Sequence, residues 1–106
     1  MAWAYLLLAG VFEIVWAYSM KLSDGFTKLT PSVVTIFFMI LSFGLLAVAM
    51  KTLPLGTAYT IWVGIGAVGA FLIGIFVLHE PMGLWRLLAA ACILFGVVLM
   101  KLTTPS

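Results

Sequence analysis

The run AWAYLLLAGVFEIVWAYSM at residues 2–20 is apolar apart from one charged side chain, Glu13, near its centre. An α-helix needs about 20 such residues to cross the hydrocarbon core of a bilayer, whereas a membrane β-strand needs about 9–11 residues of alternating polarity. The run does not alternate, so it predicts a transmembrane helix. It has no basic segment before it and no small-residue cleavage site, which favours a permanent span over a signal peptide.

Three similar runs follow, and short segments rich in charges and turn residues separate them. The four helices are expected at approximately residues 2–20, 32–50, 56–78 and 84–102. We therefore expect residues 1–106 to form a single all-α membrane domain of four transmembrane helices.

The composition excludes several classes of protein. Hydrophobic residues make up 66% of the chain, charged residues make up 8%, and the mean hydropathy is +1.35. A soluble domain of this length could not hide that much apolar surface from water. The five basic residues are scattered, which argues against binding of nucleic acid. No catalytic triad, phosphate-binding loop or cysteine cluster is present, so we expect no enzyme, no cofactor and no metal site.

The basic residues in the connections give almost no preference for one orientation in the membrane. Lys51 and Lys101 fall on one side of a four-helix arrangement, and Lys21, Lys28 and Arg86 fall on the other. Orientation follows an excess of Lys and Arg on the cytoplasmic side, and here the two sides nearly balance. The chain is therefore expected to insert both ways, and two copies to pair as an antiparallel homodimer, which reproduces the inverted repeat of larger transporters.

Glu13 is the residue most indicative of function. A charged group at mid-membrane costs about 2.5–3.5 kcal/mol on insertion scales, so such residues are rare and usually functional. Low dielectric disfavours the charged carboxylate, while a neighbouring cation favours it. A proton and a cation would then compete for one carboxyl group, which is the physical basis of an antiporter. The alternative is a protonated glutamate that makes a packing hydrogen bond.

Helical spacing indicates which residues surround Glu13. The candidate binding residues are Glu13, Trp16, Ser42, Tyr59 and Trp62, and possible supporting residues are Gly10, Met39, Phe43, Gly66 and Lys101. Gly10 leaves space one turn from Glu13, and Trp16 offers an indole N–H to the carboxylate and a ring face to a cation. Trp16 facing lipid is the alternative.

Two of the candidate residues allow two interpretations each. Ser42 can hydrogen-bond Glu13, but a membrane serine bonds its own helix backbone about as readily. Lys101 is either an anchor at the membrane surface or a charge that acts near the site.

Small residues predict helix contacts elsewhere in the chain. Ala89, Cys92 and Gly96 give the fourth run a small-residue face suited to helix pairing in the dimer. The segment GIGAVG at residues 64–69 matches a dinucleotide-binding pattern, but it lies inside an apolar run rather than after a strand. Its glycines are expected to allow close helix contact or a bend.

Several segments together resemble the small multidrug resistance family along nearly the whole chain. They are FEIVWA at 12–17, MKLSDGFT at 20–27, PS at 31–32, SF at 42–43 and LPLGTAYTIWVGIG at 53–66. At Trp16 and Lys101 the chain resembles the guanidinium-exporter branch of that family. Thr60, where alanine is common, and the pair Tyr18-Ser19 depart from the usual pattern.

The resemblance implies a proton-coupled antiporter in the bacterial inner membrane, which exports guanidinium and small guanidinyl cations. It implies that Glu13 is the essential membrane glutamate, that Tyr59 and Trp62 are aromatic site residues, and that the partners are a second copy, protons and the lipid bilayer. Three alternatives remain open: a broader exporter of quaternary ammonium or aromatic cations, one subunit of a heteromeric pair, and a small structural membrane protein without transport.

Overall fold

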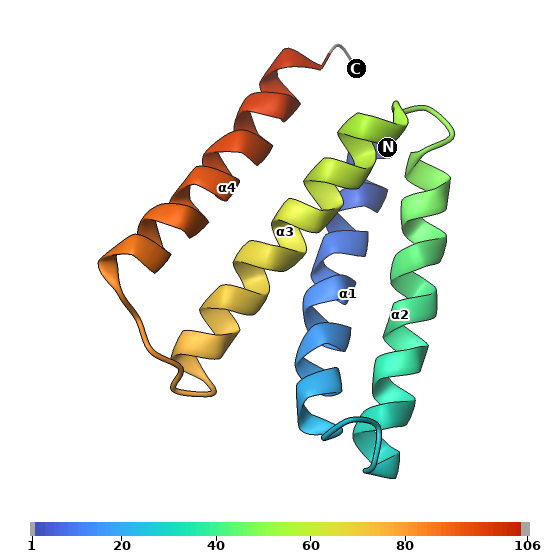
Figure 1. The fold of residues 1–106 in the computed structure, drawn as a ribbon. Helices are drawn as coiled ribbons and strands as arrows, with labels where there is room; N and C mark the ends of the chain where they lie inside the picture. The colour runs from blue at the N-terminus through green and yellow to red at the C-terminus, as the bar shows by residue number, and fades with distance from the viewer. Residues whose placement is uncertain (1, 105–106) are drawn as a thin grey trace.

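Four α-helices form the structure, a computed structural model that describes residues 2–104 (Figure 1). They are α1 (Ala2–Leu22), α2 (Leu29–Ala49), α3 (Leu55–Phe76) and α4 (Leu84–Thr103). Each is long and apolar enough to cross a membrane. Helices suit that environment because they hydrogen-bond their own backbone where no water is present to do so. The all-α fold with four transmembrane helices is therefore confirmed.

Successive helices run in opposite directions, so the connections alternate between the two ends of the molecule. The chain termini and the α2–α3 connection lie at one end, and the α1–α2 and α3–α4 connections lie at the other (Figure 1). The first end carries Lys51 and Lys101, and the second carries Lys21, Lys28 and Arg86.

The helices pack unequally. Within residues 2–104, α1 packs against both α2 and α3, whereas α4 packs closely only against α3 and reaches α1 through the Lys101 side chain (Figure 1). The buried apolar residues belong to the first three helices and the α2–α3 connection: Leu6, Ala9, Leu46, Ala49, Leu53, Ala58, Ile61 and Trp62. No residue of α4 is buried in the single copy. The core that positions the site is thus a three-helix unit.

Three helix ends differ by two or more residues from the ranges expected from the sequence. Helix α1 ends at Leu22, beyond the expected residue 20. Helix α2 begins at Leu29, before the expected residue 32, and so contains Pro31 in its first turn. Proline is tolerated there because the first backbone N–H groups of a helix have no helical partner. Helix α3 ends at Phe76, short of the expected residue 78.

The α1–α2 connection has an unusual backbone. Asp24, Gly25 and Phe26 have φ values of 51°, 73° and 66°, so three successive residues lie in the left-handed region. Ser23, which is fully buried, holds this turn: its hydroxyl donates to the Met20 carbonyl oxygen at 2.7 Å and accepts the Phe26 N–H at 3.0 Å. The tight turn sets the spacing between α1 and α2.

We expect Ser23→Ala to lower the free energy of unfolding by about 1–3 kcal/mol, because it removes two hydrogen bonds of the turn, the one donated to the Met20 carbonyl oxygen and the one accepted from the Phe26 N–H. Reversible unfolding in detergent micelles would measure the change. Ser32→Ala is the control: its hydroxyl is exposed and bonds only the Lys28 carbonyl one turn back in the helix. Equal effects from the two variants would contradict a special role for Ser23.

Candidate functional site

Glu13 lies against a gap in α3 that only glycine provides. A methyl group at Gly66 would overlap the carboxyl group of Glu13. Two neighbouring contacts follow the same pattern: Ile14 of α1 fills the notch at Gly69, and Ile65 of α3 fills the notch at Gly10. Gly10 was predicted to leave space one turn from Glu13; in the structure Ile65 occupies that space, so Gly10 allows α3 to approach. Close packing of α1 on α3 therefore fixes where the Glu13 carboxyl group lies.

Two polar atoms of α1 are buried and have no hydrogen-bond partner in the structure. They are Oε1 of Glu13 and the indole Nε1 of Trp16. The bond that the sequence analysis envisaged between these two side chains is thus not formed. Buried polar atoms are nearly always paired, so an unpaired acceptor and an unpaired donor one turn apart call for an explanation. An arriving proton, cation or water molecule would satisfy them.

Ser42 links three helices by hydrogen bonds. It is fully buried, its hydroxyl donates to the carbonyl oxygen of Ala9 at 2.7 Å, and its oxygen accepts the indole N–H of Trp62 at 3.0 Å. Neither interpretation of Ser42 from the sequence is observed, because it bonds neither Glu13 nor its own helix. In an α-helix the Ala9 carbonyl faces the backbone N–H of Glu13. The Trp62–Ser42–Ala9 chain therefore positions the turn of α1 that carries Glu13.

Four aromatic rings from three helices form a continuous series beside this chain. Trp16 and Phe43 have ring centroids 6.2 Å apart, Phe43 and Trp62 are 5.6 Å apart, and Trp62 and Tyr59 are 5.7 Å apart. The first two pairs meet edge to face, which the charge distribution of aromatic rings favours. Tyr59 and Phe43 are about half exposed, whereas Trp62 is buried. The structure thus brings the aromatic site candidates together.

Two supporting candidates lie at the edge of this arrangement or away from it. Met39 is partly buried on α2, one turn before Phe43. The Lys101 ammonium group lies 4.5 Å from the ring centroid of Trp3, near the start of α1. Trp3 is ten residues from Glu13, or about 15 Å along a helix. In the single copy Lys101 therefore makes a cation–π contact between α4 and α1 rather than joining the site.

The glycine-rich segment of α3 serves close helix contacts, as expected from the sequence. Besides the contacts of Gly66 and Gly69 with α1, a methyl group at Gly64 would overlap Val97 of α4. The dinucleotide pattern has no strand before it, because it lies wholly within α3.

The small residues expected to pair α4 with another helix are all exposed. Cys92 and Gly96 line a cavity of about 440 Å³ between α3 and α4, which Tyr59 and Thr60 also line. Ala89 lines a separate cavity nearer the α3–α4 connection. These surfaces have no partner helix within the described chain.

Sequence reasoning missed two participants in this region. The carbonyl oxygen of Ala9 carries no side-chain signal, so only the packing of α2 on α1 reveals it. Glu80 was passed over because it falls in a connection, although it is one of only three acidic residues in the chain. Its carboxyl group fills a notch at Gly74.

Four apolar helices, one of which carries a partly buried carboxyl group at mid-span, define a small multi-pass membrane protein. The chain belongs to the small multidrug resistance family: the family model described as Small Multidrug Resistance protein matches residues 1–99. Relatives named "Guanidinium exporter" are similar over 104 residues, which is 98% of this chain. The one from Proteus vulgaris is 53% identical and covered in full, and those from Citrobacter freundii and Escherichia coli (strain K12) are 51% identical and 99% covered. With its family and its four spanning helices, the chain is a multi-pass inner-membrane protein.

We expect Gly66→Ala to destabilise the fold by about 1–3 kcal/mol, because the added methyl group forces the Glu13 side chain or α3 to move. Unfolding in detergent micelles would measure the loss, and carbodiimide modification of Glu13 would report the displaced carboxyl group through a changed rate. Gly56→Ala is the matched control on the same helix, where a methyl group meets no atom within 4 Å. Equal behaviour of the two variants would show that Gly66 does not seat Glu13.

Proposed function

We propose that this protein is a proton-coupled antiporter that exports guanidinium and small guanidinyl cations, a transporter rather than an enzyme. The names of its relatives support the substrate. The observation that carries the proposal is the buried, unpaired carboxyl oxygen of Glu13 in the middle of a transmembrane helix. That atom needs a partner, and a cation or a proton supplies one.

Guanidinium suits the groups around Glu13. Its planar fork of N–H donors matches a carboxylate in a bidentate arrangement, and its faces stack on aromatic rings. The ring series that includes Trp16 and Tyr59 offers such faces. The indole N–H of Trp62 is already donated to Ser42, which fixes the orientation of that ring. The Ser42 oxygen keeps a second lone pair that can accept from a cation.

Exchange follows from competition at a single carboxyl group. When Glu13 is protonated it cannot form an ion pair, so a bound cation leaves; when a cation arrives, the charged form is favoured and the proton leaves. Because the proton and the cation bind the same carboxyl oxygens of Glu13, binding of one displaces the other. If the site opens to either side of the membrane only when occupied, cation movement one way drives proton movement the other way.

The functional unit in this proposal is an antiparallel homodimer with two Glu13 facing a shared cavity. Three features support it: α4 packs closely only against α3 and has no buried residue, its small residues Cys92 and Gly96 line an open cavity, and the basic residues nearly balance between the two ends. Two carboxyl groups could release two protons for each monovalent cation, which would make transport electrogenic.

Glu13→Gln should abolish proton-coupled transport while the protein still folds, because glutamine keeps the shape and hydrogen bonding but cannot exchange a proton. The measurement is proton flux driven by a guanidinium gradient in liposomes, with the membrane potential clamped at several values. In the unmodified protein the apparent affinity for guanidinium should fall as the pH falls, since protons displace the cation.

Asp24→Asn is the control for this variant, because it removes a carboxylate from the α1–α2 connection outside the spanning helices. Its flux should match that of the unmodified protein. Proton movement by Glu13→Gln would overturn the mechanism, and preferential exchange of a quaternary ammonium cation would reassign the substrate.

The antiparallel arrangement predicts that roughly half of the copies place the C-terminus on each side of the membrane. Thr104→Cys, made in a Cys92→Ala background, provides a single thiol at the end of α4. A membrane-impermeant maleimide applied to intact cells should label about half of the protein, and permeabilisation should expose the rest. Labelling of all copies or of none would exclude mixed orientation.

A further inference from the structure

The α3–α4 connection folds back so that Glu80 lies against the last turns of α3. The backbone N–H of Glu80 donates to the carbonyl oxygen of Gly74 at 2.9 Å. A methyl group at Gly74 would overlap the Glu80 carboxyl group, so this glycine leaves the room that the carboxyl group occupies. His79 just before it adopts a left-handed φ of 58°, which turns the chain back. Glu80 is thus held in place although its side chain is exposed.

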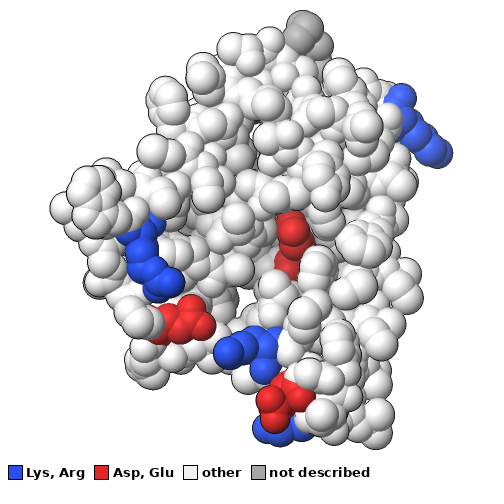
Figure 2. All heavy atoms as spheres, in the orientation of Figure 1, with Lys and Arg blue, Asp and Glu red and all other residues white. Residues whose placement is uncertain are grey.

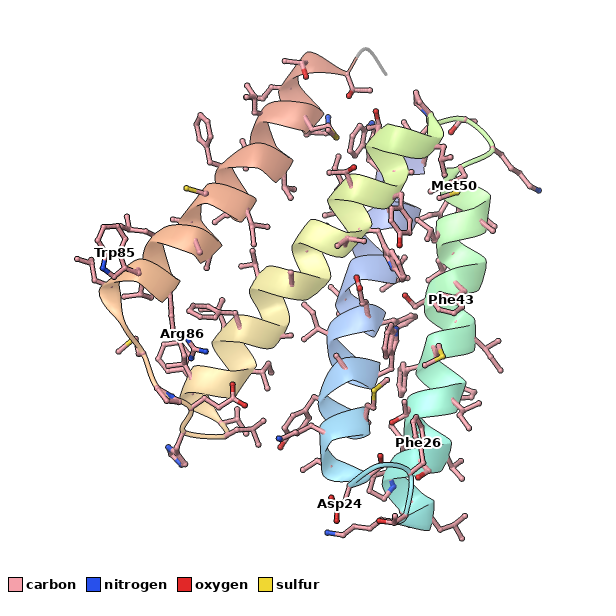
Figure 3. All side chains as sticks on the ribbon, viewed as in Figure 1. Asp24, Phe26, Phe43, Met50, Trp85 and Arg86 are labelled. Atoms are coloured by element: carbon pink, nitrogen blue, oxygen red, sulfur yellow. The ribbon has the colours of Figure 1, made fainter. Side chains whose placement is uncertain are left out.

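Glu80 is shared by two clefts, and each contains one basic residue. A cleft of about 220 Å³ between α1 and α3 is lined by Glu80, Lys21 and Tyr18 among others. A cleft of about 300 Å³ between α3 and α4 is lined by Glu80 and Arg86 among others. Arg86 extends from the start of α4 toward α3, and its Nη1 donates to the Pro81 carbonyl oxygen at 3.0 Å (Figure 3). Acidic and basic side chains gather at this end of the molecule around a hollow in the surface (Figure 2).

The α1–α3 cleft leads toward Glu13. Ala17 and Ala70 line it, and these lie one helical turn beyond Glu13 and Gly66 respectively. Ile14, the neighbour of Glu13 on α1, is seated in the notch at Gly69, the neighbour of Ala70 on α3. The cleft therefore reaches to within one helical turn of Glu13 and offers a route toward the site, with Glu80 and Lys21 at its outer end.

We propose that Glu80 sets the electrostatic potential at the outer end of this route and so controls how fast cations reach Glu13. Without Glu80, the positive charge of Lys21 would stand uncompensated in this cleft, with Arg86 in the neighbouring cleft, and would repel an approaching guanidinium ion. With Glu80 the formal charges that line the α1–α3 cleft sum to zero. Charges at the opening of a cleft act mainly on association rates, and salt screens their effect. The inference rests on the cation transport proposed above.

The test compares Glu80→Gln with the unmodified protein in liposomes, at ionic strengths from about 10 mM to about 1 M set by potassium chloride. A unit charge roughly 6 Å from the path of a cation, in water-like surroundings, changes its encounter rate about threefold. We expect kcat/KM for guanidinium to fall about threefold at low salt, with kcat unchanged. The difference should disappear near 1 M, where the screening length is about 3 Å. Lys21→Gln should raise kcat/KM by a similar factor at low salt, and this increase should also disappear near 1 M.

Asp24→Asn is the matched control, because it removes an equal charge at the same end of the molecule from a residue that lines neither cleft. Asparagine also tolerates the left-handed backbone of that position. Its kcat/KM should follow that of the unmodified protein, and Glu80→Asp should restore most of the rate. A loss in Glu80→Gln that is the same at every salt concentration, or that Asp24→Asn matches, would overturn the proposal. Absence of guanidinium transport by the unmodified protein would instead overturn the proposed function.

Discussion

The close packing of α1 against α3 is the constraint on which the other features of this structure depend. Gly66 and Gly69 of α3 receive Glu13 and Ile14, and Gly10 of α1 receives Ile65. Inside a membrane the hydrophobic effect does not drive helices together. Small residues favour their association because they let the backbones come close enough for extensive van der Waals contact. The same contacts hold the Glu13 side chain in place, with one of its carboxyl oxygens buried. The packing of α1 on α3 therefore both stabilises the fold and positions the carboxyl group that the proposed exchange uses.

The hydrogen bonds from Trp62 to Ser42 and from Ser42 to Ala9 connect α3 and α2 to α1 beside this contact. Both bonds are buried, where an unmade bond is costly, so the three helices are expected to keep their relative positions around Glu13. Movement during transport would then occur between this three-helix unit and its neighbours. Helix α4 fits this division, because it packs closely only against α3 and contacts α1 through the Lys101 side chain.

The sequence predicts the four helices well, because long apolar runs separated by turn residues leave few alternatives in a membrane. It also identifies Glu13, whose charge stands out within such a run. The details of the site are harder to predict, because they depend on side chains from different helices meeting backbone atoms. Ser42 bonds a carbonyl of α1 that no sequence pattern marks, and Gly10 is filled by Ile65 rather than left open. The contact of Lys101 with Trp3 likewise depends on how α4 lies on α3.

An even number of spans places both termini at the same end of the molecule (Figure 1). This has a consequence for gene fusion. Joining the C-terminus of one copy directly to the N-terminus of another would produce two copies that point the same way through the membrane. A single polypeptide that contained two opposed copies would need an odd number of additional spanning helices between them. If the working unit is antiparallel, simple tandem duplication cannot produce it, and separate chains that insert both ways are the shorter route.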